Sequence, residues 1–221
     1  MPYARIRGPD MRIIAGKAKG RVLVAPKAKV LRPTADRVKE SLFNILSVEG
    51  RRFLDLFAGA GSVGLEAASR GASRVLFVES NRACAQAIRA NIERCGFLNM
   101  PAGEPGEGGV RDIEVIECSA ERALRLLGHR GERFDVIFAD PPYGEGAADA
   151  ALRLVRSLGL LEPGGVFVVQ HSVRDGIPAR REGYRVEDSR RYGDTALSFL
   201  TLTAAPEGEE EEPGERGRSD G

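Results

Sequence analysis

From residue 53 onward, short apolar runs alternate with glycine turns and amphipathic stretches. The runs predict strands at 53–57, 74–79, 113–117, 136–139, 166–170 and 196–203, and helices at 64–69, 82–94, 120–127 and 147–158. Strands that alternate with helices in this way lie parallel, joined by crossover helices. The continuous apolar run at 136–139 suits a strand that is covered on both faces. The pattern therefore predicts a doubly wound, mostly parallel α/β sheet with helices on both faces.

The first 50 residues follow a different pattern. Two short apolar runs, 12–15 and 21–24, flank the glycine-bounded basic segment 16–20. This arrangement predicts a β-hairpin whose tip presents Lys17 and Lys19 to solvent.

A helix is expected after this hairpin. Either Thr34 or Asp36 can cap it, because both side chains accept hydrogen bonds from the first free backbone N–H groups. Its apolar positions fall on one face, which we expect to pack on the sheet, and they are Val38, Leu42, Ile45 and Leu46.

The length of 221 residues allows one well-buried domain with appendages. We divide the chain into a basic arm with the hairpin (1–34), a main domain (35–204) and an acidic tail (205–221). Proline and glycine dominate residues 98–110 inside the main domain, which predicts a flexible surface insert. The tail, rich in Glu, Gly and Pro, is expected to be disordered.

Charge is distributed unevenly along the chain. Residues 1–40 contain eleven Lys and Arg against three acids, a net charge of +8, whereas residues 206–221 have a net charge of −5. A basic arm is a common footprint for binding a phosphate backbone, although a solvated charged face would give the same composition.

The chain has few residues that suit a metal centre or a disulfide framework. Its cysteines are Cys84, Cys95 and Cys118, its histidines are His129 and His171, and none has metal-ligand spacing. We expect no metal. No apolar run is long enough to cross a bilayer, and the start of the chain is too polar for a signal peptide, so we expect a soluble, cytoplasmic protein with no membrane partner.

A glycine-rich turn follows the strand predicted at 53–57. In Asp55-Leu56-Phe57-Ala58-Gly59-Ala60-Gly61-Ser62-Val63-Gly64, the residues Gly59 and Gly61 can adopt positive φ and let the backbone approach a ligand closely. The Gly-x-Gly-x-x-Gly pattern alone is a weak signal, because a tight structural turn reads the same way.

Glu79 and Asp55 make the ligand more specific. Glu79 ends the next strand, beside the turn, where its carboxylate can accept hydrogen bonds from both hydroxyls of a ribose. Nicotinamide dinucleotides and S-adenosylmethionine share this feature. Asp55 favours the second, because a carboxylate there repels a pyrophosphate and attracts the ammonium and sulfonium of S-adenosylmethionine.

Asp140-Pro141-Pro142-Tyr143 follows the strand predicted at 136–139, at the same edge of the sheet. An exocyclic base amine is a poor nucleophile, so a catalyst must hold both N–H groups and favour a pyramidal nitrogen. The Asp140 carboxylate and the Pro141 carbonyl can supply the two acceptors, and the proline rings stiffen the turn. Tyr143 can stack on an extruded base, and alignment of nitrogen, methyl carbon and sulfur would be the main catalytic effect.

These residues resemble the motifs of class I, Rossmann-like amino-methyltransferases. The N-terminal Arg12-Ile-Ile-Ala-Gly, Gly20-Arg21, Arg32-Pro33-Thr34, Asp36-Arg37-Val38 and Glu40-Ser41-Leu42-Phe43-Asn44 are similar to the signature of bacterial small-subunit (16S) ribosomal RNA guanine-N2 methyltransferases. The similarity covers about residues 11–203.

The resemblance implies a seven-stranded sheet and transfer of one methyl group from S-adenosylmethionine to guanine N2 in an assembled or partly assembled small subunit. It implies that Ser119 and Ala120 lie near the adenine. Many related enzymes have an acidic residue there, and Glu121 is a less favoured substitute. The implied cofactor-binding residues are Asp55, Phe57, Ala58, Gly59, Gly61, Glu79, Ser80, Ser119, Ala120 and Asp140. The implied RNA-facing residues are Arg12, Lys17, Lys19, Arg21, Arg32, Arg37 and Lys39.

Other functions stay open on the sequence alone. Asp140 to Tyr143 would serve equally an enzyme that methylates adenine N6 in DNA or a protein glutamine. A nicotinamide-dependent dehydrogenase is disfavoured by Asp55 and by the lack of a hydride-transfer constellation. A noncatalytic RNA-binding module is disfavoured by the intact acidic positions.

Overall fold

The computed structural model describes residues 3–4, 11–26, 34–97, 110, 112–142, 146–174, 180–181 and 183–203. Five helices lie within these ranges: α1 (Asp36–Ile45), α2 (Ser62–Ser69), α3 (Arg82–Arg94), α4 (Ala120–His129) and α5 (Ala147–Ser157). The strands are β1 (Tyr3–Ala4), β2 (Ala25–Pro26), β3 (Arg52–Leu56), β4 (Arg74–Val78), β5 (Asp112–Ile116), β6 (Phe134–Ala139), β7 (Leu161–Ser172), β8 (Arg180–Arg181), β9 (Tyr184–Tyr192) and β10 (Thr195–Leu202).

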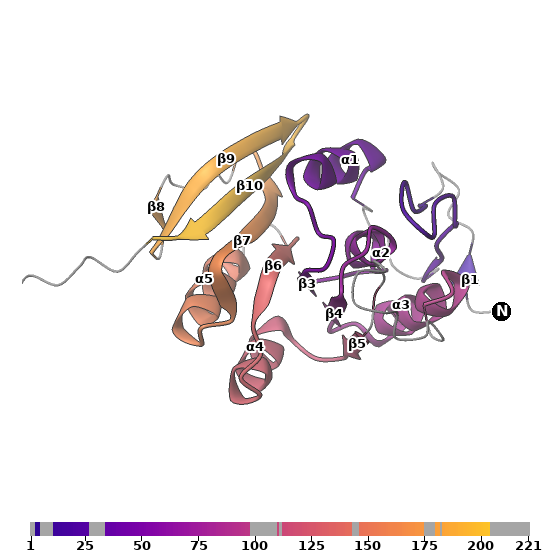
Figure 1. The fold of residues 1–221 in the computed structure, drawn as a ribbon, viewed down its shortest axis with the longest axis horizontal. Helices are drawn as coiled ribbons and strands as arrows, with labels where there is room; N and C mark the ends of the chain where they lie inside the picture. Colours follow the sequence, from indigo (N-terminus) through magenta and orange to yellow (C-terminus); the bar gives the residue numbers. More distant parts are fainter. Residues whose placement is uncertain are drawn as a thin grey trace, which may run out of the picture.

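One large sheet organises the molecule (Figure 1). Its strand order is β5-β4-β3-β6-β7-β10-β9-β8. β3 pairs in parallel with both β4 and β6, β5 and β7 extend this parallel part, and β10, β9 and β8 continue it antiparallel. The mostly parallel seven-stranded sheet expected from the sequence is confirmed, with the two-residue β8 as a further edge strand.

Helices cover both faces of the sheet, as predicted. Side chains of α1, α2 and α3 share a buried cluster with Phe53, Phe77 and Phe138, whereas α4 and α5 share the other cluster with Leu54 and Leu56. Successive residues of a strand thus point to opposite, fully covered faces, which explains why the central strands read as continuous apolar runs.

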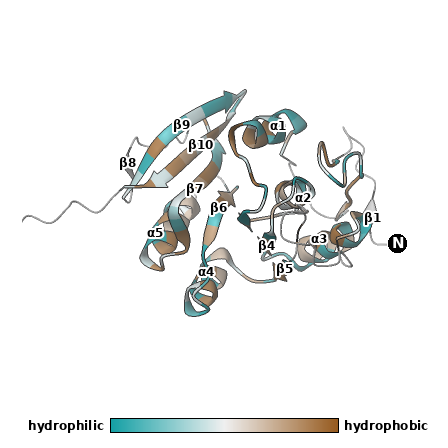
Figure 2. Cartoon of the chain, viewed as in Figure 1, coloured by the Kyte–Doolittle hydropathy of each residue, from teal (hydrophilic) through white to brown (hydrophobic). Residues whose placement is uncertain are grey.

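The antiparallel part of the sheet was only partly visible in the sequence. β7 extends over 161–172 instead of 166–170, and β9 was not predicted. Figure 2 shows hydrophilic residues along much of β9, because most of its exposed positions are charged. Charged residues are depleted in most strands, so the sequence of β9 does not predict a strand.

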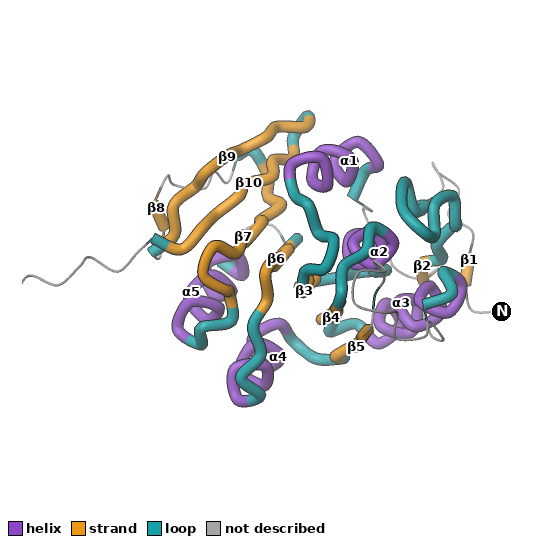
Figure 3. Tube along the Cα trace, in the orientation of Figure 1, coloured by secondary structure: helices purple, strands orange, loops and turns teal. Residues whose placement is uncertain are grey.

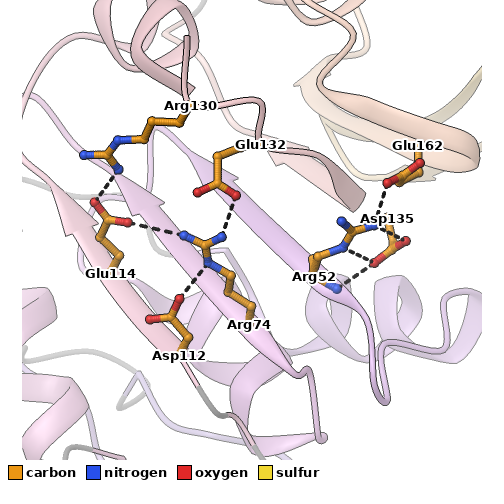
Figure 4. Close-up of polar contacts among 8 residues, drawn as sticks. All are labelled: Arg52, Arg74, Asp112, Glu114, Arg130, Glu132, Asp135 and Glu162. Atoms are coloured by element: carbon orange, nitrogen blue, oxygen red, sulfur yellow. Dashed lines mark hydrogen bonds and ion pairs between the residues drawn. The ribbon is translucent and has the colours of Figure 1, made fainter. Parts of the chain in front are cut away.

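Two arginines tie the strands together at the edge where β3 and β4 begin (Figure 4). Arg74 forms ion pairs with Asp112 (2.8 Å), Glu114 (3.5 Å) and Glu132 (2.5 Å). Arg52 does the same with two carboxylates of β6 and β7, Asp135 (3.2 Å) and Glu162 (2.8 Å). Since parallel strands begin at this edge, these pairs lie at the opposite end of the strands from the glycine turn.

The predicted N-terminal hairpin is present only in minimal form. Residues 12–15 and 21–24 are joined by a single antiparallel bridge, Arg12 to Val22, and Figure 3 shows this segment as loop, not as strands. Backbone hydrogen bonds join its two arms, from the Ile13 N–H to the Arg21 carbonyl (3.0 Å) and from the Leu23 N–H to the Met11 carbonyl (2.7 Å), and the main domain holds the segment as well. Its backbone N–H groups at 17 and 18 donate to the Ser69 carbonyl (2.8 Å) and hydroxyl (2.9 Å) at the end of α2.

Helix α1 corrects three details of the sequence analysis. Its N-cap is Ala35, and neither Thr34 nor Asp36 caps it through a side chain. Ile45 is 39% exposed, and Phe43 takes its place on the buried face. Lys39 is fully buried: its ammonium donates to the Arg12 carbonyl (2.6 Å) and pairs with Asp36 (3.3 Å). The expectation that Lys39 faces RNA is therefore wrong for this structure, because its charge is used to attach the N-terminal segment to α1.

Several expectations lie outside the described residues. They are the flexible insert, of which only Val110 is described, and the acidic tail. Among the helices that are described, none has the length and apolarity that a membrane crossing requires.

Candidate cofactor and methyl-transfer site

A pocket of about 380 Å³ opens at the carboxyl ends of β3, β4 and β6. Nine of the ten residues predicted to bind a cofactor line it: Asp55, Phe57, Ala58, Gly59, Glu79, Ser80, Ser119, Ala120 and Asp140. The tenth, Gly61, supports the turn beneath it. The topology explains the convergence, because parallel strands bring their following loops to one edge of the sheet.

The glycine turn adopts left-handed backbone at Phe57 (φ 62°), Gly59 (φ 58°) and Gly61 (φ 81°). A Cβ on Gly59 would meet no atom within 4 Å, so this position faces open space. A Cβ on Gly64 would lie 2.4 Å from the Phe77 ring, so this glycine is needed for helix packing. Phe57 is the one non-glycine residue with positive φ in the described chain, and such strain is concentrated at binding sites.

Asp55 is almost completely buried under the turn. Its carboxylate accepts a hydrogen bond from the Gly64 N–H (2.9 Å) and so fixes the first turn of α2. Burial raises the pKa of Asp55 to about 8, opposed by the Gly64 hydrogen bond and assisted by the nearby charges of Asp140 and Glu79. A cation in the pocket would favour the ionised form of Asp55 and lower its pKa.

Glu79 ties the glycine turn to the start of α3. Its two carboxylate oxygens accept from the backbone N–H groups of Gly59 (2.8 Å) and Asn81 (2.7 Å). Each carboxylate oxygen can accept a further hydrogen bond, so the pair of acceptors expected for a ribose is present in the pocket wall.

Asp140 stands where the cofactor pocket meets a second pocket of about 570 Å³. Pro142 and Thr34 also line both, whereas Pro141 lines only the second. Burial raises the pKa of Asp140 to about 7, and a hydrogen bond from the Gln170 side chain lowers it. Tyr143 lies outside the described residues.

Ser119 stands where many related enzymes have an acidic residue near the adenine. The Ser119 hydroxyl accepts from the Arg122 N–H (3.4 Å) as the N-cap of α4. Glu121 is exposed, pairs with Arg125 (3.0 Å) and does not line the pocket, so it is not a substitute.

Sequence reasoning missed several lining residues. Met11 and Thr34 come from the N-terminal region, Val63 from inside the glycine motif, and Cys118 from the position just before Ser119. Two of them had a signal in the sequence, because Thr34 follows Arg32-Pro33 in the N-terminal signature and Val63 is part of the glycine motif. The others are brought to the pocket by tertiary packing.

The lining of the cofactor pocket fits a cationic ligand better than a phosphate. It contains the carboxylates of Asp55, Glu79 and Asp140, and no Lys or Arg is among the described residues that line it. S-adenosylmethionine, with its ribose, ammonium and sulfonium, suits this set of groups. Within the described part of the chain, no group of three His, Cys, Asp or Glu side chains could hold a metal ion.

The predicted RNA-facing residues differ in exposure. Arg32 lies outside the described residues, and Lys39 is buried. The other five are exposed: Arg12, Lys17, Lys19, Arg21 and Arg37. Arg12 pairs with Asp36 (3.2 Å), and Arg37 lines the second pocket beside Asp140.

The fold and the pocket define the chain as a class I S-adenosylmethionine-dependent methyltransferase. Residues 11–201 match the family described as Conserved hypothetical protein 95, and the chain belongs to it. It is 36% identical over 191 residues to "Putative rRNA methyltransferase YlbH" of Bacillus subtilis, covering 86% of this chain and 97% of the relative. It is 30% identical over 200 residues to "Ribosomal RNA small subunit methyltransferase D" of Escherichia coli, covering 90% and 93%. The solved structure of "Putative methyltransferase yhhF from Escherichia coli" superposes with a TM-score of 0.72 at 29% identity, covering 89% of this chain and 100% of that one.

Proposed function

We propose that this protein transfers a methyl group from S-adenosylmethionine to the exocyclic N2 of a guanine in small-subunit (16S) ribosomal RNA. The observation that supports this most directly is the place of Asp140, a carboxylate between the cofactor pocket and a second pocket that can admit a base. The Bacillus subtilis and Escherichia coli relatives are named as ribosomal RNA methyltransferases, which favours ribosomal RNA as the substrate. We further propose an assembled or partly assembled subunit as the substrate, encountered in the cytoplasm.

The residues at this boundary have distinct roles in the proposal. S-adenosylmethionine, when bound, supplies the methyl group on a sulfonium and leaves as neutral S-adenosylhomocysteine. The Asp140 carboxylate accepts one N–H of the guanine amine, and the Pro141 carbonyl accepts the other, which favours a pyramidal nitrogen. As the nitrogen gains its bond to the methyl carbon it becomes positive, and Asp140 takes up the proton it loses. A carboxylate with a pKa of about 7 is suited to this exchange near neutral pH.

The exposed cations give the RNA a path to the site. Lys17, Lys19 and Arg21 lie on the N-terminal segment, and Arg37 stands at the second pocket. In this proposal they contact phosphates and position the RNA, while the pocket beside Asp140 selects the base.

Methyl mapping tests the proposed activity. The full chain and S-adenosylmethionine would be incubated with unmodified small subunits, naked 16S rRNA and DNA, and methylated nucleosides identified by mass spectrometry. We expect N2-methylguanosine at one position of the small subunit. N6-methyladenine in DNA, or a methylated glutamine on a ribosomal protein, would contradict the proposal.

The role of Asp140 is tested by Asp140→Asn. Asparagine can still accept a hydrogen bond but cannot take up the proton, so kcat should fall by about 10²- to 10⁴-fold, the usual contribution of a general base. A matched control is Asp188→Asn on β9, whose carboxylate pairs with Arg190 away from both pockets and should leave kcat unchanged. Near-normal turnover in Asp140→Asn, with cofactor affinity intact, would remove Asp140 from the catalytic role.

A further inference from the structure

The second pocket is built around one buried side chain that the proposed reaction has not yet used. Gln170 lies on β7, directly after Val169, which pairs with Ala139 of β6. Gln170, inside β7, therefore lies level with Asp140, the residue that follows β6, and both line the second pocket. Tyr192 and Thr195 of the antiparallel strands complete that side of the pocket.

The two ends of the Gln170 amide have different partners. Gln170 is 6% exposed, and its side-chain amide hydrogen-bonds the Asp140 carboxylate. Since a carboxylate only accepts, the amide nitrogen is the end that faces Asp140. The carbonyl oxygen Oε1 is buried and has no hydrogen-bond partner among the described residues. Buried acceptors are nearly always paired in native proteins, so this oxygen calls for a donor that arrives with a ligand.

Guanine differs from the other bases in what lies next to its exocyclic amine. Its N2 amine is adjacent to N1–H, a second donor. The amine of adenine or cytosine is flanked by one ring nitrogen that accepts and one ring carbon, and the amide of a glutamine side chain is flanked by a carbonyl, so none has a neighbouring N–H. Two neighbouring acceptors, one for the amine and one for an adjacent N–H, therefore match guanine alone among these targets.

We propose that Gln170 is a specificity-determining residue, whose carbonyl oxygen accepts the N1–H of the target guanine while Asp140 accepts an N2–H. This inference rests on the proposed function. The oxygen is covered in this structure, so contact with a base requires a rotation of the terminal amide, a torsion with broad preferences. An adenine placed in the same pocket would set its N1 lone pair against this oxygen, so adenine N1 and Gln170 Oε1 would both be left unpaired, although Asp140 could still accept from the amine.

The test compares two bases that share the amine but differ at N1. Small-subunit RNA would be assembled with either guanine or 2,6-diaminopurine at the position found by methyl mapping. Diaminopurine keeps the 2-amino group, but its N1 is an acceptor with no hydrogen. We expect the wild-type kcat/KM for guanine to exceed that for diaminopurine by about 10- to 100-fold, the usual loss when a buried acceptor is left unpaired.

Gln170→Met removes the acceptor while keeping a side chain of similar length. We expect it to lower kcat/KM on guanine by about 10- to 100-fold and to leave the rate on diaminopurine within about threefold, so that the preference disappears. The matched control is Gln86→Met, the same change at an exposed position of α3, which should keep the preference. Calorimetric cofactor affinity shows that each variant is folded, because neither residue lines the cofactor pocket.

The outcomes separate this inference from the proposed function. If the wild type leaves guanine unmethylated, the proposed function fails. If the wild type methylates guanine but treats diaminopurine equally well, or if Gln170→Met lowers both rates by the same factor, the function stands and the inference about Gln170 is overturned. An equal loss on both bases would instead assign Gln170 to positioning Asp140.

Discussion

At the scale of single residues, the site depends on carboxylates held where water cannot solvate them. Asp55 is the extreme case, because one buried carboxyl both fixes the Gly64 N–H and faces the cofactor pocket. Its pKa of about 8, against 3.8 when exposed, means that the native protein keeps a proton that the unfolded chain has lost. Asp55 therefore costs stability, increasingly so as pH rises from about 4 to 8, and the cost persists because the charge serves a ligand.

Asp55→Asn should separate stability from binding. Asparagine can still accept from the Gly64 N–H but cannot ionise, so we expect a higher free energy of unfolding for the unliganded variant, with the advantage growing between pH 5 and pH 8. The gain should be at least about 1 kcal/mol at pH 8, the equivalent of one pKa unit. Urea unfolding at both pH values measures it.

The same substitution should weaken S-adenosylmethionine binding in calorimetry, because the cation loses a carboxylate. The affinity of the wild type for S-adenosylmethionine should rise between pH 6 and pH 8, because binding releases a proton from Asp55. In the variant, the affinity should depend less on pH. Asp194→Asn, at an exposed position, is the control and should change neither quantity. If the variant is less stable than the wild type at pH 8, Asp55 stabilises the folded protein and the prediction is wrong.

At the scale of elements, buried polar side chains of α2 and α3 hold the N-terminal segment in place. Glu66 accepts from the N–H groups of residues 14 (2.7 Å) and 15 (3.0 Å). Asn91 accepts from the Val24 N–H (2.8 Å) and donates to the Val24 carbonyl (2.9 Å) and the Ala60 carbonyl (3.0 Å). Because Ala60 lines the cofactor pocket, Asn91 joins the N-terminal segment to the cofactor turn.

Asn91→Ala should destabilise the protein by about 2–4 kcal/mol, because it leaves buried backbone groups at Val24 and Ala60 without partners. It should also weaken cofactor binding and speed protease cleavage within residues 11–26. Arg94→Ala on the same helix is the matched control: its contacts with the Val22 carbonyl are exposed and long (3.4 Å), so we expect less than about 0.5 kcal/mol. Equal losses in the two variants would argue against a special role for Asn91.

At the scale of the whole molecule, the parallel and antiparallel parts of the sheet contribute to different pockets of the proposed site. Loops after the parallel strands β3, β4, β5 and β6 line the cofactor pocket, whereas β7, β9 and β10 supply Gln170, Tyr192 and Thr195 to the second pocket. Asp140 lies where these parts meet. In the proposed function, exposed cations on the N-terminal segment and α1 extend the site toward the RNA.

Neutralising these cations should weaken RNA binding in a salt-dependent way. We expect Lys17→Gln, Lys19→Gln, Arg21→Gln and Arg37→Gln each to reduce the slope of log affinity against log salt by about 1 if the residue contacts a phosphate. Fluorescence titration of small-subunit RNA at several salt concentrations measures this slope.

Lys39→Gln is the matched control for that series. Lys39 is buried and bonded to the Arg12 carbonyl, so its loss should lower the free energy of unfolding by about 1–3 kcal/mol and leave the salt slope unchanged. RNA binding that does not respond to ionic strength would contradict the electrostatic role of the exposed residues.

The sequence by itself determined the alternation of strands and helices, the glycine turn and the two acidic motifs at strand ends. These features are local, since apolar runs, glycines and short motifs are set by neighbours in the chain, and the parallel topology then follows. Only the tertiary structure decided that Lys39 is buried, that Asp55 holds Gly64, that Met11 reaches the pocket, and that Gln170 stands beside Asp140. Each of these depends on which segments, distant in sequence, share a face or exclude water, and no local pattern encodes that.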